Sequence, residues 1–237
     1  MNEQSQRSTT SGIGGLSMNV IEVKNMSKNF KNKKLFNKFS LEIEENTVHA
    51  LVGPNGSGKT SLLRILTGLY DQDGGEVNVK GSHAMLLEND YLYEDKTGLE
   101  NIKLYGLYFG YGLDNYQKYA DLLELTNDLD RNVSTYSKGM KRKLSLLIIV
   151  MMNREIIFLD EVTSGVDPIS RVEIRKLIKL LKDEGKTIVL TSHDLSEIEK
   201  VADKVSMIKS GELLFTKNID EIQGESLEDL FIEEGTK

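Results

Sequence analysis

The chain has 237 residues, no cysteine and a formal net charge of −7. This length suffices for one large α/β domain, or for a domain with an inserted lobe, that buries its core without disulfides. The acidic balance argues against a dedicated nucleic-acid-binding protein.

The first 18 residues are polar and rich in serine, threonine and glycine. They lack the apolar core of a signal peptide, so we expect a disordered leader over residues 1–18 and a folded domain over 19–237. The longest apolar run, residues 144–152, is interrupted by Ser145. It falls far short of the ~20 residues needed to cross a bilayer, and any work on a membrane is expected to need a partner protein.

The segment before residue 80 is predicted to be rich in β-structure. Strand-like runs occur at 20–23, 41–43, 48–52 and 76–79, separated by clusters of Asn, Lys and Gly. Six lysines make its first part basic: Lys24, Lys28, Lys31, Lys33, Lys34 and Lys38. We interpret them as a solvated hairpin edge, because edge strands commonly carry such charges.

The most informative motif is the octet GPNGSGKT at residues 53–60, of the form G-x-x-x-x-G-K-[ST]. It follows the strand 48–52 and precedes a helix predicted to start at Ser61. The glycines allow successive N–H groups to point at phosphate oxygens, while Lys59 reaches the outer phosphates and the Thr60 hydroxyl faces Mg²⁺. A plain strand-turn-helix connection would not need these placed residues. The predicted nucleotide-binding residues are Gly53, Pro54, Asn55, Gly56, Ser57, Gly58, Lys59, Thr60 and Ser61.

Between residues 90 and 152 apolar residues recur at helical spacing, which predicts an inserted helical subdomain. Seven of the nine tyrosines fall within residues 88–119: Tyr91, Tyr93, Tyr105, Tyr108, Tyr111, Tyr116 and Tyr119. Aromatic rings with a polar tip suit a groove that receives a helix of another protein. Packing within the helical subdomain is an equally good explanation for any one of them.

The segment YSKGM at residues 136–140 precedes three cations, Lys141, Arg142 and Lys143, and then an apolar helix. Cations are poorly placed at a helix N-terminus unless an anion binds there, which favours a second phosphate site. An ordinary N-cap at Ser137 would explain the segment in isolation.

An apolar strand at residues 156–159 ends in two adjacent carboxylates, Asp160 and Glu161. In parallel sheets, the carboxyl ends of strands open onto the crevice where nucleotides bind. We expect Asp160 to hold Mg²⁺, directly or through water, and Glu161 to accept a proton from an attacking water or to orient it. The alternative, a strand that leaves the core into an acidic turn, does not account for the phosphate loop upstream.

Strand patterns return at 187–191, 205–208 and 213–216, and they alternate with helical patterns over 170–182 and 195–201. An acidic amphipathic segment near residue 230 predicts a short closing helix. Alternating strands and helices after a phosphate loop predict an α/β fold of the P-loop NTPase class. It would contain a mostly parallel, helix-covered core sheet, an antiparallel β subdomain and a helical subdomain over about 90–152.

The phosphate loop, the YSKGM segment and the acidic strand follow one another as in the ATP-binding subunits of ABC transporters, which the chain resembles over about residues 20–231. YSKGM resembles the LSGGQ signature of that family in the variant form seen in exporters, with Met140 in the glutamine position. The resemblance implies nucleotide contacts from four residues: Ser137, Lys138, Gly139 and Met140.

The same resemblance implies roles for three further residues. Asp167, in the segment 164–167, would communicate between two subunits, and His193 would contact the γ-phosphate. Phe30 would stack on adenine. A core position for Phe30 and a strand-ending cap for His193 are the alternatives.

Two positions depart from the family pattern. Glu88 stands where many members have the glutamine that links Mg²⁺ to the transmembrane partner. A carboxylate can approach Mg²⁺ or its water shell but cannot donate a hydrogen bond as an amide does. Val162 replaces a common proline, which changes the stiffness of the turn more than its chemistry.

The resemblance implies a subunit that binds and hydrolyses ATP with Mg²⁺ and pairs with a second copy or a homologous ATPase. It would drive export through a separate transmembrane permease, at the cytoplasmic face of the membrane, with no nucleic acid. Two rivals remain for comparison. A P-loop GTPase switch needs an N-K-x-D motif after the acidic strand, and a nucleic-acid machine of the same superfamily needs a coiled-coil insertion or two cassettes. Neither feature is in the sequence, which does not name the cargo.

Overall fold

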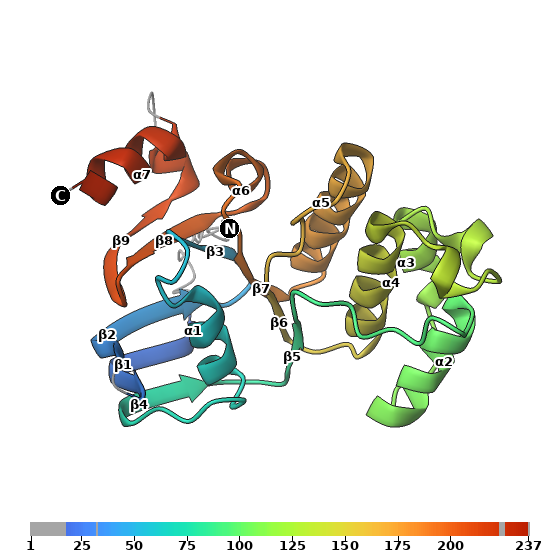
Figure 1. The fold of residues 1–237 in the computed structure, drawn as a ribbon, viewed down its shortest axis with the longest axis horizontal. Helices are drawn as coiled ribbons and strands as arrows, with labels where there is room; N and C mark the ends of the chain where they lie inside the picture. The colour runs from blue at the N-terminus through green and yellow to red at the C-terminus, as the bar shows by residue number, and fades with distance from the viewer. Residues whose placement is uncertain (1–17, 32, 223–225, 237) are drawn as a thin grey trace, which may run out of the picture.

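Figure 1 shows the fold in a computed structural model, which describes residues 18–31, 33–222 and 226–236. The predicted leader, residues 1–18, lies outside the described residues except for Met18. The described chain forms two sheets with helices packed against them. A mostly parallel core sheet beside an antiparallel one confirms the predicted α/β fold class.

The antiparallel sheet has the strand order β2-β1-β4. Its strands are β1 (Asn19–Phe30), β2 (Lys33–Glu44) and β4 (Gly74–Val79), so the predicted strands exist but all three are longer than predicted, the first two most of all. One face is apolar and packs over the helix α1 (Lys59–Leu66). Five of the six lysines are exposed and Lys28 is half-buried, which agrees with a solvated hairpin.

The core sheet has six strands. The first five in spatial order run parallel to one another, and the sixth pairs antiparallel with the fifth. In spatial order they are β5 (His83–Leu86), β6 (Ile156–Leu159), β7 (Thr187–Thr191), β3 (Val48–Val52), β8 (Lys204–Lys209) and β9 (Glu212–Asn218). Every residue of β3, β6 and β7 is buried, as expected of parallel strands covered on both faces. Because these three are parallel neighbours, the loops after them meet at one edge of the sheet.

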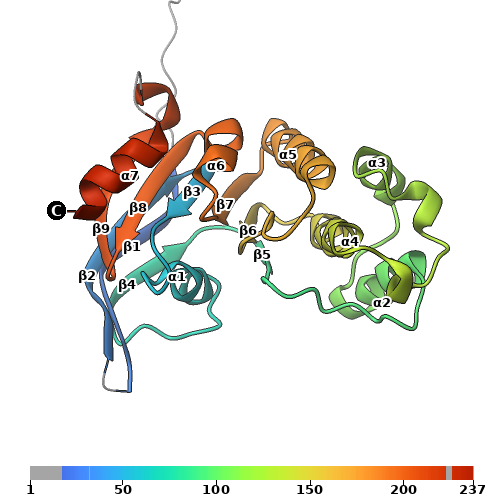
Figure 2. The same cartoon turned by 45° about the horizontal axis from the view of Figure 1, so that its top comes forward.

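Between β5 and β6 the described chain contains helices and no strand. These are α2 (Gly98–Phe109), α3 (Tyr116–Leu122) and α4 (Lys138–Met151), with the 3₁₀ turns η1 (Thr126–Asp128) and η2 (Val133–Thr135). Figure 2 shows the three α-helices grouped on one side of the molecule, beyond β5. An inserted subdomain with the boundaries 90–152 stays a prediction.

The remaining helices lie after β6. They are α5 (Pro168–Asp183), α6 (Leu195–Val201), the 3₁₀ turn η3 (Ile219–Glu221) and the predicted closing helix α7 (Leu227–Thr236). Asp167 caps α5 by accepting from the N–H groups of the first turn, with Pro168 at the first helical position. In the described residues, no helix combines the length and apolarity needed to span a bilayer.

His49 lies in the middle of the core sheet, on β3, and is fully buried. Its Nε2 lies 2.8 Å from the hydroxyl of Ser206, which lies 2.7 Å from the hydroxyl of Thr216. Its Nδ1 has no hydrogen-bond partner among the described residues. Burial, and secondarily the charge of Lys204, lowers the pKa of His49 to about 4, against an opposing effect of Glu44.

This histidine predicts a loss of stability in mild acid. The unfolded chain takes up a proton near its ordinary pKa of about 6.5, whereas the folded chain does so only near pH 4, so stability falls as pH drops between these values. We expect His49 to remove about 2 kcal/mol of unfolding free energy between pH 7 and pH 5. Urea denaturation of the parent and of His49→Gln at both values tests this, and an equal pH dependence of the two proteins would refute it.

Candidate functional site

The phosphate loop joins β3 to α1. The helix begins at Lys59, two residues before the predicted start, and Gly58 is its N-cap with a φ of 112°. A Cβ at Gly58 would lie 2.7 Å from Cζ of Phe36, so both the backbone angle and the space require glycine there. The loop conformation is therefore specified by its sequence and by the β2 residue packed behind it.

Lys59 is 7% exposed and folds back over its own loop. Its Nζ donates to the carbonyl oxygens of Gly53 at 2.7 Å and Pro54 at 3.2 Å. Burial lowers the pKa of Lys59, and the nearby carboxylates of Glu161 and Asp160 act in the opposite direction. A buried ammonium held by neutral carbonyls is suited to a stronger anionic ligand, such as a phosphate.

Asp160 follows β6 and is 1% exposed. Its Oδ1 accepts from the hydroxyl of Thr60 at 3.1 Å and from that of Thr191, at the end of β7, at 2.7 Å. The structure thus brings Thr60 and Asp160 together, as predicted for a metal site. Thr191 was not predicted as a site residue. A hydroxyl that ends an apolar strand beside a histidine was the available signal.

The residues present fit Mg²⁺ of the kind that is bound with phosphate. Among the described residues no group of three or more His, Cys, Asp or Glu side chains could hold a metal ion by itself. Mg²⁺ sites in nucleotide-binding proteins typically use one or two protein carboxylates and complete the shell with phosphate oxygens and waters. Thr60, Asp160 and the exposed Glu88 supply oxygen ligands of that chemistry.

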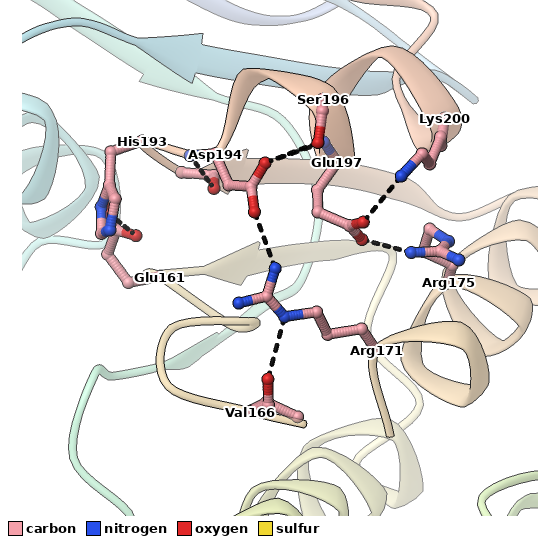
Figure 3. A network of polar contacts seen from close by, with 10 residues as sticks. Glu161, Val166, Arg171, Arg175, His193, Asp194, Ser196, Glu197 and Lys200 are labelled. Atoms are coloured by element: carbon pink, nitrogen blue, oxygen red, sulfur yellow. Dashed lines mark hydrogen bonds and ion pairs between the residues drawn. The ribbon is translucent and has the colours of Figure 1, made fainter. Parts of the chain in front are cut away.

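Glu161 has a left-handed backbone, with a φ of 49°, which costs of order 1–3 kcal/mol for a residue other than glycine. Its N–H donates to the hydroxyl of Thr191 at 3.0 Å. The side chain lies 2.9 Å from Nδ1 of His193, a contact drawn in Figure 3. The following Val162 is buried, so an apolar residue replaces the family's common proline there without exposing the turn.

A cleft of about 450 Å³ is lined by six of the nine predicted residues of the phosphate loop, whereas Gly53, Pro54 and Ser57 do not line it. Phe30 lines it and is 39% exposed, with its ring edge-on to Tyr70 at 5.5 Å, so it does not occupy the core. The other residues along the cleft are Leu35, Asn55, Gly56, Gly58, Lys59, Thr60, Ser61, Glu88, Glu161 and His193. Residues from the antiparallel sheet, from the start of α1 and from the loops that follow β3, β5, β6 and β7 therefore face one space.

The YSKGM segment and Asp167 do not line this cleft. Ser137 is the N-cap of α4 and its Oγ accepts from Met140 N at 3.2 Å. A Cβ on Gly139 would lie only 2.6 Å from Oδ2 of Asp167, so the starts of α4 and α5 are packed closely. Within one chain, these predicted nucleotide contacts lie on a separate surface.

The cations at the start of α4 have protein partners. Lys141 pairs with Glu94, and the buried Lys143 pairs with the buried Glu173 of α5 at 2.6 Å. Arg142 donates to backbone carbonyls and to Asp90. These contacts and the Ser137 cap explain the charges without a bound anion, and the second phosphate site stays a prediction based on the motif.

Arg171 connects the loop before α5 to the loop before α6, as Figure 3 shows. Its Nε donates to the carbonyl of Val166 at 2.9 Å and its Nη1 to the carboxylate of Asp194 at 2.7 Å. The loop of Asp167 and the loop of His193 are thereby held together. The sequence offered no local signal for this contact, since its partners lie 5 and 23 residues away.

Comparisons with known proteins agree with this site. A protein-family model described as "ABC transporter" matches residues 36–164. Over 221 residues the chain is 31% identical to the lantibiotic transport ATP-binding protein SrtF of Streptococcus pyogenes, covering 90% of this chain and 96% of that protein. It is also 31% identical over 223 residues to the daunorubicin resistance ATP-binding protein DrrA3 of Streptomyces coeruleorubidus, covering 87% and 71%.

Solved structures share the fold. The structure of an ATP-binding subunit of an ABC transporter superposes with a TM-score of 0.82 at 22% identity, covering 92% of this chain and 100% of that one. A nucleotide-free ATP-binding cassette superposes with a TM-score of 0.77 at 21% identity, covering 91% and 99%. With its phosphate loop, carboxylate pair and cleft, the chain belongs to the ABC transporter ATP-binding family, whose standard activity is ATP hydrolysis.

Proposed function

We propose that two copies of the chain, or one copy and a homologous ATPase, close head to tail around two ATP molecules. The observation that carries this proposal is the separation of the predicted nucleotide contacts. The cleft holds Lys59, Glu161 and His193, whereas Ser137 to Met140 lie outside it on the same chain. In a closed pair, the α4 start of one copy covers the cleft of the other, and Asp167 beside it contacts the opposite site.

In the closed state, the amides of the phosphate loop and Lys59 hold the β- and γ-phosphates, and Phe30 stacks on adenine. Thr60, Asp160 and Glu88 hold Mg²⁺, which neutralises phosphate charge. Glu161 accepts a proton from the attacking water. His193, whose Nδ1 lies 2.9 Å from Oε2 of Glu161, contacts the γ-phosphate. Positioning and charge stabilisation supply most of the catalysis of phosphoryl transfer.

The proposed pair drives export through a separate transmembrane permease, at the cytoplasmic face of the membrane. The printed names of two relatives refer to lantibiotic transport and daunorubicin resistance. Their names and the methionine of YSKGM support export over import. A soluble ABC-type or other P-loop ATPase that acts as a switch or on nucleic acid is the alternative.

An apolar groove of about 120 Å³ is the proposed binding site for a helix of the permease. It lies between β5, the following loop, α2 and α4 (Figure 1), and Tyr91, Tyr105, Ile148 and Ile149 are among its lining residues. Tyr91 is 66% exposed, so its ring is available to a partner. Tyr105 also packs against the core. Three other tyrosines of the stretch pack against the core and do not line the groove: Tyr111, Tyr116 and Tyr119.

Lys59→Met is expected to lower ATP affinity and turnover together. Loss of a charge-assisted contact to phosphate weakens binding by about tenfold or more and turnover by about a hundredfold. Equilibrium binding of a fluorescent ATP analogue and steady-state hydrolysis measure the two effects. Lys179→Met, which removes an exposed lysine of α5, is the matched control and should leave both unchanged.

Glu161→Gln is expected to spare binding and to slow hydrolysis strongly. The amide fits the same space and keeps the backbone strain but cannot accept the proton, so kcat falls by about a hundredfold or more while ATP affinity stays within about threefold. Single-turnover hydrolysis and analogue binding test this. Hydrolysis at the parent rate would show that Glu161 is not the base.

Tyr91→Glu is expected to abolish co-purification with the membrane partner, because a carboxylate at the groove rim cannot be buried against an apolar helix. Tyr108→Glu is the control: it is 82% exposed and does not line the groove. Affinity purification from native membranes reads out the effect. Recovery of RNA or DNA without any multi-span protein would instead support the nucleic-acid alternative.

A further inference from the structure

Arg142, in the second turn of α4, is a buried arginine with an unusual set of partners. It is 3% exposed, and every nitrogen of its guanidinium donates within the protein. Nε donates to Val162 O at 3.2 Å, Nη2 to Asp160 O at 2.7 Å, and Nη1 to Leu87 O at 2.6 Å, Glu88 O at 3.2 Å and Asp90 Oδ1 at 3.2 Å. Four of these five acceptors are backbone carbonyls.

Such an arrangement is specific to arginine. A buried cation is costly unless hydrogen bonds and opposite charge satisfy it. Here one carboxylate, Asp90, and four carbonyl dipoles do so. The planar fork of the guanidinium reaches acceptors in three directions, which the single ammonium of lysine cannot do.

Two of the carbonyls flank Glu161. The carbonyl of Asp160 belongs to the peptide group that leads into Glu161, and the N–H of that same peptide donates to Thr191 Oγ1 at 3.0 Å. The carbonyl of Val162, the residue after Glu161, belongs to the peptide group that joins Val162 to Thr163. The peptide before Glu161 is thus held from both sides, and the residue itself has the strained φ of 49°. Strain of this kind persists only where the surroundings enforce it.

The other two carbonyls belong to the loop after β5. Arg142 holds this loop at Leu87 and Glu88, and Glu88 lines the same cleft as Glu161. The same arginine therefore holds the backbone at Glu88 and next to Glu161, the two glutamates whose carboxylates line the proposed ATP cleft. It sits two residues after Met140, on the helix that begins at Lys138.

We infer that Arg142 is a positioning residue for ATP hydrolysis, which holds the backbone on both sides of Glu161 and ties it to the Glu88 loop and to the start of α4. The inference rests on the proposed function, because it assigns Arg142 an effect exerted through Glu161. Arg142 does not line the cleft, so we assign it no direct contact with ATP.

A double-mutant cycle tests this inference with the full chain. Arg142→Gln should lower the single-turnover rate of hydrolysis by about tenfold or more while ATP-analogue affinity stays within about threefold. In the Glu161→Gln background the same change should cost less than about twofold, because its effect runs through a base that is already absent. A purely structural role would lower the rate equally in both backgrounds, and that result overturns the inference.

Arg131→Gln is the matched control, since Arg131 is an exposed arginine between η1 and η2 whose side-chain partners, Asp128 and Thr135, lie in those two turns. It should change neither rate. Arg142→Lys keeps the charge but loses the planar fork of the guanidinium. It should fold and lower the single-turnover rate less than Arg142→Gln does, again with little further effect in the Glu161→Gln background. If the Arg142→Lys protein is unfolded, the role of Arg142 is to stabilise the fold, and the inference is overturned. Failure of the parent to hydrolyse ATP, or full activity of Glu161→Gln, would instead defeat the proposed function.

Discussion

A carboxylate buried at the end of a strand needs hydrogen-bond donors, and Asp160 finds them on two other segments. Thr60, in the first turn of α1, and Thr191, at the end of β7, both donate to one of its oxygens. This is possible only because β3, β6 and β7 are adjacent and parallel, so that the chain leaves all three at the same edge. The register of the sheet thereby sets the geometry of the site.

Hydrogen bonds to the backbone hold the charged groups around this edge. Lys59 contacts two carbonyls of its own loop, and Arg171 contacts one carbonyl of the loop before α5. Lys59 thereby fixes its own loop, whereas Arg171, which also contacts Asp194, joins two loops directly. The loops of the site consequently behave as parts of one framework, although they are far apart in sequence.

The sequence predicted the elements that carry a strong local pattern. The strands at 48–52, 156–159 and 187–191 were predicted with the observed boundaries, because buried parallel strands read as continuous apolar runs. β5 was missed because HAML is short and has no β-branched residue. The grouping of Phe30, Lys59 and Glu161 around one cleft followed from motifs. Most contacts of Arg142 could not be predicted, since four of the five acceptors are backbone carbonyls 18 to 55 residues away that no side-chain pattern marks.

The left-handed backbone of Glu161 has an evolutionary consequence. Glycine and asparagine adopt that conformation at lower cost than glutamate, so most of the strain at this position would disappear on replacement. A lineage that no longer needed ATP turnover would relieve this strain by the very substitution that ends catalysis, at the cost of the contact with His193 and of a charge beside Lys59. Position 161 is therefore where a working copy and a silent, nucleotide-binding descendant of this chain would first diverge.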